Sequence, residues 1–310
     1  MITVYKKTAQ AQSLATLDQF ESGTWINVID PQAEEIDSLA HQLKLDFFTL
    51  KTALEVDEKP RVEKDPLGNI FILIRVPARE LDGRIQVLPL TIIVTPSSIV
   101  TIAPQETKIL GDFLTGEGRD FYTTKKTRFV IQILHRTNFY FQKLLNQIER
   151  DIDVNEKLLL KSFRNAEIVA LLAIQKSLVY FNTAVVGNGK VLERILKGTS
   201  LKLYTEDSEF LEDMIIENKE SIEMVNIYSD ILANTMDAYA SIISNNLNIV
   251  MKFLTSVTII LALPTIVASV YGMNVSLPFQ AHPLAFWYTL VMSLFLISAA
   301  TLIFVKKNYF

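Results

Sequence analysis

The chain has 310 residues, of which 49% are hydrophobic, and its formal net charge is −4. It contains no cysteine, which excludes disulfide bonds and thiolate metal sites. The acidic balance and the lack of a basic patch argue against nucleic acid as a partner. The length fits one large domain or two smaller ones.

The first third of the chain alternates strand and helix signals. Gly, Pro, Asp or Ser residues bound short β-branched runs, while "AEEIDSLAHQL" and "FFTLKTALEV" have helical spacing. We therefore predict a cytoplasmic α/β domain over about residues 1–120. Its expected strands are "ITVY", "TWINVI", "NIFILIRV", "LTIIVT" and "SIVTIA".

From Thr124 onward the apolar residues recur at helical spacing, which predicts a helical stalk over 121–250. A third helical pattern starts near Glu206, and no proline interrupts it before Pro264. A continuous helix from Asp207 to Val270 would be roughly 95 Å long at about 1.5 Å per residue. Such a helix is not stable alone, so we expect it to pack in a bundle or against copies of itself.

The end of the chain has the composition of a membrane anchor. No Asp, Glu, Lys or Arg occurs between Lys252 and Lys306. Because one membrane helix needs roughly 20 apolar residues, two spans fit here, at about 251–270 and 284–305. We therefore predict a two-helix transmembrane domain over 251–310 with a short outer loop at about 274–283.

Basic residues set the expected orientation of the two spans. Lys252 lies at the start of the first span, and Lys306 and Lys307 follow the second. Positive residues favour the cytoplasmic side, so both termini and the soluble part are expected in the cytoplasm. The N-terminus lacks the apolar core of a signal peptide. We expect a multi-pass protein of a bacterial cell membrane.

One side of the long helix is almost entirely polar or small, with a period close to 3.5. In its cytoplasmic half, a solvated surface explains this polar stripe equally well. In the membrane half, polar side chains face protein or water, so the residues either pack between helices or line a pore. Spacing alone slightly favours packing, but the stripe continues past both membrane boundaries, which favours a pore. The stripe consists of Asp230, Asn234, Asp237, Ser241, Ser244, Asn248, Met251, Thr255, Thr258, Ala262, Thr265 and Ser269.

The cytoplasmic part of this helix is strongly acidic. Between Glu206 and Asp237 there are ten carboxylates and one basic residue, Lys219. Charges of one sign attract the opposite ion when they line a cleft, although such a run is more often only a solvated surface. In a symmetric bundle these carboxylates would need cations to screen them.

Tyr271-Gly272-Met273-Asn274, placed between two C-terminal spans and followed by a basic end, resembles the CorA family of divalent-cation channels. "NNLNIVMKFLT" (245–255) and "EKPRVEKD" (58–65) are similar to segments of that family. The resemblance implies an α+β membrane protein that assembles as a funnel-shaped homopentamer. It consists of an N-terminal cytoplasmic α/β domain, a long helical stalk and two transmembrane helices.

The resemblance also implies the function and its residues. The protein would be a channel for passive uptake of hydrated Mg²⁺, with no organic cofactor. Gly272, Met273 and Asn274 would form the selectivity filter, and Gly272 would let the backbone bend so that Asn274 points inward. The first span would line the pore. Its lining and gate residues would be Asn248, Met251, Leu254, Thr255, Thr258, Ala262, Thr265, Ser269 and Asp237.

Mg²⁺ dehydrates reluctantly and keeps its waters, so neutral amide oxygens of Asn274 suit a filter that binds the hydrated ion weakly enough to release it. Met251 and Leu254 suit a gate that closes by excluding water. Family members sense cytoplasmic Mg²⁺ through acidic residues, which makes Glu212 and Asp213 the candidates for a regulatory site here. A solvated acidic surface is an equally good explanation for either residue.

The ion preference stays open at this point. The outer loop "VSLPFQAHP" has no acidic residue, and His282 is its only ionisable group. A lone loop histidine is more often incidental than a ligand. The intact Gly-Met-Asn favours magnesium over the zinc-transporting branch, but Co²⁺, Ni²⁺ or Zn²⁺ are alternatives.

Two other classes of function compete with a channel. An enzyme is disfavoured, because "GNGK" (187–190) lacks the earlier glycine of a phosphate-binding loop and the chain has only three histidines. The second class is a membrane-anchored oligomeric sensor or scaffold that does not conduct. Asn274 and the polar stripe within the membrane distinguish a channel from such a passive anchor.

Overall fold

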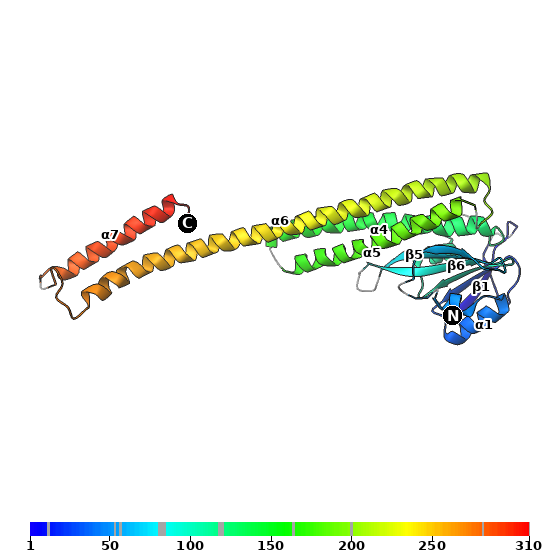
Figure 1. Ribbon diagram of the computed structural model, residues 1–310, viewed down its shortest axis with the longest axis horizontal. Coiled ribbons are helices and arrows are strands. Elements are labelled where there is room, and N and C mark those ends of the chain that lie inside the picture. Colours follow the sequence, from blue (N-terminus) through cyan, green and yellow to red (C-terminus); the bar gives the residue numbers. More distant parts are fainter. Residues whose placement is uncertain are drawn as a thin grey trace. The chain divides into compact units, whose positions relative to one another are not determined.

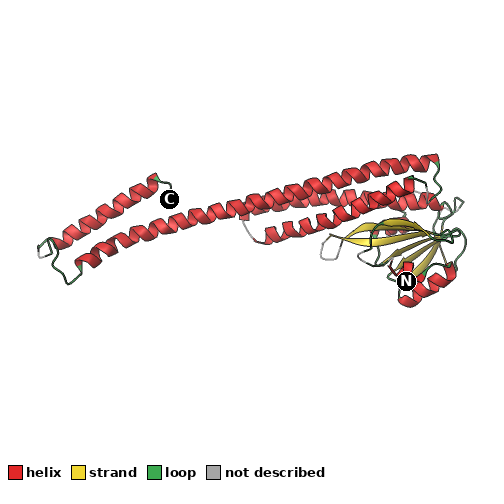
Figure 2. Cartoon of the chain, in the orientation of Figure 1, coloured by secondary structure: helices red, strands yellow, loops and turns green. Residues whose placement is uncertain are grey.

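The computed structural model describes residues 1–10, 13–52, 54–55, 58–79, 85–116, 121–162, 165–198, 201–280 and 282–309. The chain divides into two compact units, Met1–Ala233 and Asn234–Phe310. The first unit contains a sheet and several helices, and the second contains the end of one long helix and the helix that follows it (Figures 1 and 2).

A seven-stranded sheet forms the centre of the first unit, in the order β2-β1-β3-β7-β6-β5-β4. β3 and β7 pair in parallel and every other neighbouring pair is antiparallel. The bounds are β1 Ile2–Lys6, β2 Ala15–Leu17, β3 Trp25–Ile29, β4 Arg61–Lys64, β5 Ile70–Arg79, β6 Ile85–Val94 and β7 Ile99–Ala103. The five strands expected from β-branched runs are all present, and β2 and β4 are additions at the two edges.

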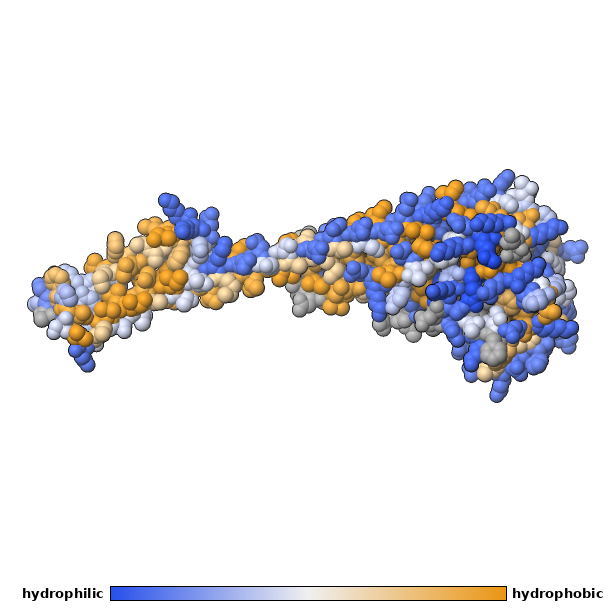
Figure 3. All heavy atoms as spheres, in the orientation of Figure 1, coloured by the Kyte–Doolittle hydropathy of each residue, from blue (hydrophilic) through white to orange (hydrophobic). Residues whose placement is uncertain are grey.

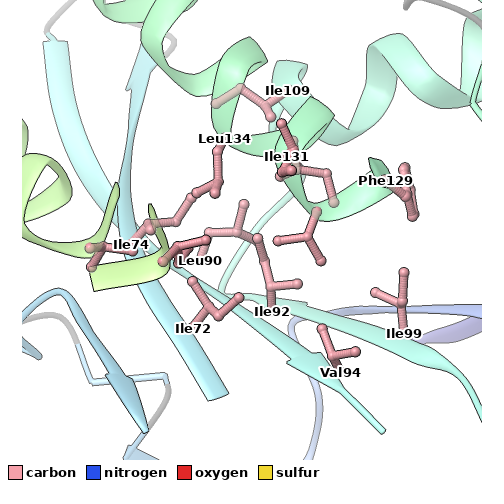
Figure 4. Packing of buried hydrophobic residues seen from close by; sticks show 14 of the residues in the cluster. Ile72, Ile74, Leu90, Ile92, Val94, Ile99, Ile109, Phe129, Ile131 and Leu134 are labelled. Carbon is pink, nitrogen blue, oxygen red and sulfur yellow. The ribbon is translucent and has the colours of Figure 1, made fainter. Parts of the chain in front are cut away.

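Helices cover both faces of this sheet, giving three layers (Figure 1). Side chains alternate along a strand. Ile72 and Ile74 therefore pack with the helices that follow β7, whereas Phe71 and Leu73 pack with the two helices between β3 and β4. Figure 4 shows the core on the Ile72 and Ile74 side of the sheet, where strand and helix side chains meet. The central strands are therefore buried on both faces, which explains their continuous apolar runs.

The helices of the first unit are α1 Ala33–Leu43, α2 Phe47–Thr52, α3 Lys108–Thr115, α4 Lys126–Ser162, α5 Asn165–Leu196 and the beginning of α6 Thr205–Tyr271. α1 and α2 cover one face through Leu39 and Leu50. α3 to α6 contribute Ile109, Val130, Val191 and other residues to the opposite core. α3 was not predicted from the sequence.

Two prolines lie in β5 and β6 without breaking the ladder between them. Pro89 of β6 is paired with Arg75 of β5, and Pro77 of β5 is paired with Val87. β4 covers β5 only from Ile70 to Leu73. Beyond the end of β4, the Asn188 side chain of α5 accepts a hydrogen bond from Arg75 N–H at 2.9 Å and donates one to Arg75 C=O at 2.7 Å. The N–H and C=O groups of Arg75 thus point away from Pro89. The β5–β6 ladder therefore needs no N–H at residue 89, and proline is tolerated there.

α6 is a single helix of 67 residues that begins in the first unit and continues into the second. Its bounds agree with the helix predicted from Asp207 to Val270. α7 spans Ala285–Lys306, close to the predicted second span. Hydrophobic residues dominate the surface over α7 and the end of α6 (Figure 3).

Candidate ion pathway

α7 runs beside α6 in the second unit (Figure 1). Lys252 Nζ lies 5.8 Å from the ring centroid of Tyr309, the residue shortly after α7. Ser256 is 0% exposed and Val267 is 5% exposed, while Ile260 and Tyr271 are partly buried. These positions are four, seven and four residues apart, so they lie on one side of the helix.

The membrane half of the polar stripe lies on the other side of α6. A helix advances about 100° per residue, which puts Thr258 roughly half a turn from Ser256 and Ala262 roughly half a turn from Val267. All six of these stripe residues are exposed in the single chain: Met251, Thr255, Thr258, Ala262, Thr265 and Ser269. Among the described residues of one chain, none covers this polar side of the helix.

The hydroxyl groups of the stripe present acceptors outward. Thr258 Oγ1 donates to Leu254 C=O at 2.8 Å, and Thr265 Oγ1 donates to Leu261 C=O at 3.3 Å. Because the single O–H of each is used on the helix itself, the oxygen lone pairs remain for other donors. Water molecules around a cation point their hydrogens outward, so these oxygens match a hydrated cation.

The predicted hydrophobic gate residues are also uncovered in the single chain. Met251 is 52% exposed and Leu254 is 56% exposed. Asn248 and Asp237, further toward the first unit, are exposed as well. The structure therefore leaves the whole predicted lining open to a partner or to solvent.

The helix ends at the predicted filter segment. Gly272 N–H donates to Ala268 C=O at 2.9 Å and Met273 N–H donates to Val270 C=O at 3.3 Å, which closes the last turn. Asn274 follows with an exposed side chain, and no described residue hydrogen-bonds to it.

Gly272 has an ordinary backbone conformation at the end of α6. The described glycines with positive φ do not include Gly272, so the turn does not use the backbone freedom that only glycine has. A Cβ at this position would lie 3.2 Å from Ala268 C=O. Ala268 C=O also accepts the hydrogen bond from Gly272 N–H, so this close approach belongs to the last turn of the helix.

Side chains within the loop between α6 and α7 hold its backbone in place. Gln280 Oε1 accepts from Leu277 N–H at 3.0 Å, and His282 Nδ1 accepts from Leu284 N–H at 3.1 Å. The His282 ring also lies 5.5 Å from the Tyr288 ring. His282 therefore supports the start of α7. Spacing alone could not reveal this role, because a histidine three residues before a helix is a weak signal.

The acidic residues of α6 differ in how far they are buried. Asp207 is 4% exposed and accepts a hydrogen bond from Arg128 of α4 at 2.7 Å, so it belongs to the fold. Burial and a hydrogen bond to Glu149 of α4 raise the pKa of Tyr228 to about 12, which keeps this phenol neutral. Glu212 and Asp213 are exposed. Among the described residues of one chain, no three His, Asp or Glu side chains gather into a metal site.

Within the described residues, three helices are long and apolar enough to cross a membrane: Ala166–Leu196, Thr205–Tyr271 and Ala285–Lys306. The first of them packs in the soluble core. Val191 and Ile195 of α5 are buried with residues of the sheet, and Asn188 bonds the backbone of β5. These contacts require α5 to lie on the sheet.

Comparisons with known proteins cover nearly the whole chain. The family model described as "CorA-like Mg²⁺ transporter protein" matches residues 20–307. The cobalt/magnesium transport protein CorA of Methanocaldococcus jannaschii is 29% identical over 92% of this chain and 90% of its own length. The protein of the same name from Thermotoga maritima is 21% identical, over 97% of this chain and 87% of its own length.

The fold has a full-length counterpart among solved structures. The complete structure of the CorA magnesium transporter from Methanocaldococcus jannaschii superposes with a TM-score of 0.86 and 26% identity. It covers 100% of this chain and 99% of the solved chain. The similarity therefore includes both units and the apolar helices.

Proposed function

The chain belongs to the CorA-like Mg²⁺ transporter family, and from this membership we propose that it forms a channel for passive uptake of hydrated Mg²⁺ across the cell membrane. α6 and α7 are the two spans, the loop between them is outside, and both termini are cytoplasmic. The observation that carries the proposal is the position of the polar stripe, about half a turn from the side of α6 that packs on α7.

This position requires several copies of the chain. A lone chain would expose Thr258 and Thr265 to hydrocarbon, where polar groups are costly. Copies arranged in a ring turn the stripe inward and leave α7 outside, against lipid. The family resemblance indicates five copies. The threonine oxygens then face a central water-filled path, where they accept hydrogen bonds from the waters of the passing cation.

The outer end of this path is the proposed filter. Mg²⁺ holds its inner waters tightly and demands octahedral geometry, so a ring of Asn274 carboxamides recognises the hydrated ion through its waters. A neutral ring binds weakly enough for release, as conduction requires. Gly272 and Met273 position this ring at the end of α6.

The cytoplasmic end of the path closes at Met251 and Leu254. Rings of these side chains exclude water when they come together, which stops a hydrated ion. Cytoplasmic Mg²⁺ bound between subunits by Glu212 and Asp213 holds the closed state and provides feedback on uptake. In this proposal a neighbouring subunit supplies the remaining ligands.

Flux into liposomes that contain the purified protein tests the channel. Wild type, Asn274→Ala and the matched loop variant Ser276→Ala are compared at low internal Mg²⁺ and inward-negative potential, after each is shown to have the same oligomeric state. We expect influx in wild type and Ser276→Ala and its loss in Asn274→Ala. No influx from correctly assembled wild type would favour a non-conducting sensor. Repeating the assay with Co²⁺, Ni²⁺ and Zn²⁺ ranks the ions.

The assembly itself is tested by two adjacent substitutions. Ser256→Leu enlarges a fully buried side chain of α6, whereas Thr255→Leu changes the exposed stripe. We expect Ser256→Leu to disturb the packing of α7 within the subunit. Thr255→Leu should leave that packing intact and reduce flux. Equal flux in Thr255→Leu and wild type would contradict an inward-facing stripe.

A further inference from the structure

The segment Gly187-Asn188-Gly189 of α5, which is not a phosphate-binding loop, contacts three different elements of the first unit. Successive residues of a helix point about 100° apart, so three neighbours can reach in three directions. Gly187 touches Pro60 ahead of β4, Asn188 bonds Arg75 of β5, and Gly189 touches Asn218 of α6.

The first two contacts attach α5 to the sheet. Asn188 is 3% exposed, and its carboxamide bonds both backbone groups of Arg75, at 2.9 and 2.7 Å. A Cβ at Gly187 would lie 2.6 Å from Pro60 Cγ, so the chain ahead of β4 rests directly on the helix backbone. These two adjacent residues therefore attach α5 directly to the sheet.

The third contact seats α6 on α5. A Cβ at Gly189 would lie 2.5 Å from Oδ1 of Asn218, and Asn218 is 2% exposed. The Asn218 carboxamide therefore occupies a notch that exists only because residue 189 has no side chain. We call this contact the Gly189 notch. The α5 side of the notch is backbone, which cannot change rotamer.

Other polar contacts also hold α6 in this unit. Arg128 of α4 reaches Asp207 at 2.7 Å, and the Asn138 side chain donates to Met214 C=O at 2.9 Å. These contacts run through side chains, which adjust when packed helices slide by small amounts. The Gly189 notch lies one turn beyond Met214, and its α5 side is helix backbone in direct contact with the Asn218 carboxamide.

We propose that the Gly189 notch is the pivot through which the sheet and α5 set the position of α6, and thereby couple cytoplasmic Mg²⁺ to the pore. The proposal rests on the proposed function, since α6 is there the helix that lines the pore. The notch holds α6 at one height along α5, so α6 tilts about this point instead of sliding. Residues far from any ion then influence the gate.

The test fills the notch and then makes room again. Gly189→Ala adds a methyl group that conflicts with Asn218, and Gly189→Ala/Asn218→Ala removes the conflict. Gly111→Ala in α3 is the matched control, because a Cβ there meets nothing within 4 Å. For each protein in liposomes, we measure the cytoplasmic Mg²⁺ concentration that halves the flux.

We expect Gly189→Ala to conduct but to shift this concentration by about fivefold or more, which is the lower end of typical coupling effects. The double variant should return close to wild type, and Gly111→Ala should not differ from it. A merely structural role predicts a lower unfolding temperature in Gly189→Ala with an unchanged Mg²⁺ midpoint, and that result overturns the proposal. If Gly189→Ala does not assemble, Asn218→Ala alone decides, since an emptied pivot must also shift the midpoint.

A conformational measurement separates this proposal from the proposed function. The rate of trypsin cleavage of the full chain in detergent is followed as Mg²⁺ is added, which needs no flux. We expect Mg²⁺ to protect wild type, and Gly189→Ala to need a different Mg²⁺ concentration for the same protection. If wild type does not conduct but this difference is present, the channel fails and the pivot stands. If the two proteins are protected at the same concentration, the pivot fails.

Discussion

Replacing Asn188 by alanine removes the two hydrogen bonds that complete the edge of β5. Arg75 N–H and C=O lose this partner at a site where Asn188 is 3% exposed. Loss of a partner costs about 1–3 kcal/mol for each buried polar group, so the two together give about 3 kcal/mol. For a unit of this size, 1 kcal/mol corresponds to about 2–4 °C. We expect the unfolding temperature of the first unit to fall by about 6–12 °C.

The fluorescence of Trp25 measures this change. Trp25 is fully buried in β3, and its Nε1–H donates to Thr101 Oγ1 at 2.8 Å. The chain has two tryptophans, so the experiment uses a Trp287→Phe background in detergent at one fixed scan rate. The control Asn226→Ala changes an exposed residue of α6 and should stay within about 0.5 kcal/mol of its parent. A loss of less than about 2 °C in Asn188→Ala would refute the reasoning, because it would mean that water or a shifted strand replaces the carboxamide.

Three further predictions concern the path and the core. Thr265→Val removes one hydrogen-bond acceptor from each subunit. Because a hydrogen bond contributes about 1 kcal/mol, we expect Mg²⁺ flux to fall about fivefold. The control Thr289→Val on α7 should not lower the flux, and equal losses in the two variants would contradict the assignment of Thr265 to the path. Leu254→Ser should leave residual flux at high cytoplasmic Mg²⁺, because a polar ring stays wet; full closure in the same flux assay argues against this gate. Asp112 is 3% exposed and bonds Arg136 and Tyr140. Urea unfolding followed by Trp25 fluorescence should therefore show that Asp112→Ala lowers the free energy of unfolding by about 3–5 kcal/mol. Tyr140→Phe should lower it by less, about 1.5–3 kcal/mol. The reverse order would be inconsistent with a buried ion pair.

Periodic features of the sequence carried most of the information about the fold. The long apolar and β-branched runs predicted five strands and all the long helices, because burial repeats with the period of each element. β4 was missed because "RVEK" is a short edge strand with one buried residue, Val62. α3 was missed because its eight residues are too few for a clear helical period.

The candidate path was predicted in part for the same reason. A period of 3.5 identified the stripe, and the structure places its membrane half about half a turn from the buried Ser256 and Val267. The hydrogen bond from Leu284 N–H to His282 and the Gly189 notch could not be predicted, since both depend on distances between residues whose order along the chain carries no periodic signal. The roles of Asn274, Glu212 and Asp213 stay predictions.

The edge of β5 has a consequence for aggregation. An open strand edge normally offers a row of N–H and C=O groups that another chain can pair with. Beyond the end of β4, β5 offers little of this kind, because Asn188 occupies both backbone groups of Arg75 and Pro77 has no N–H to give. The exposed end of this long apolar strand is thereby a poor template for a second chain. Asn188 and Pro77 therefore disfavour edge-to-edge association between newly made copies of the protein.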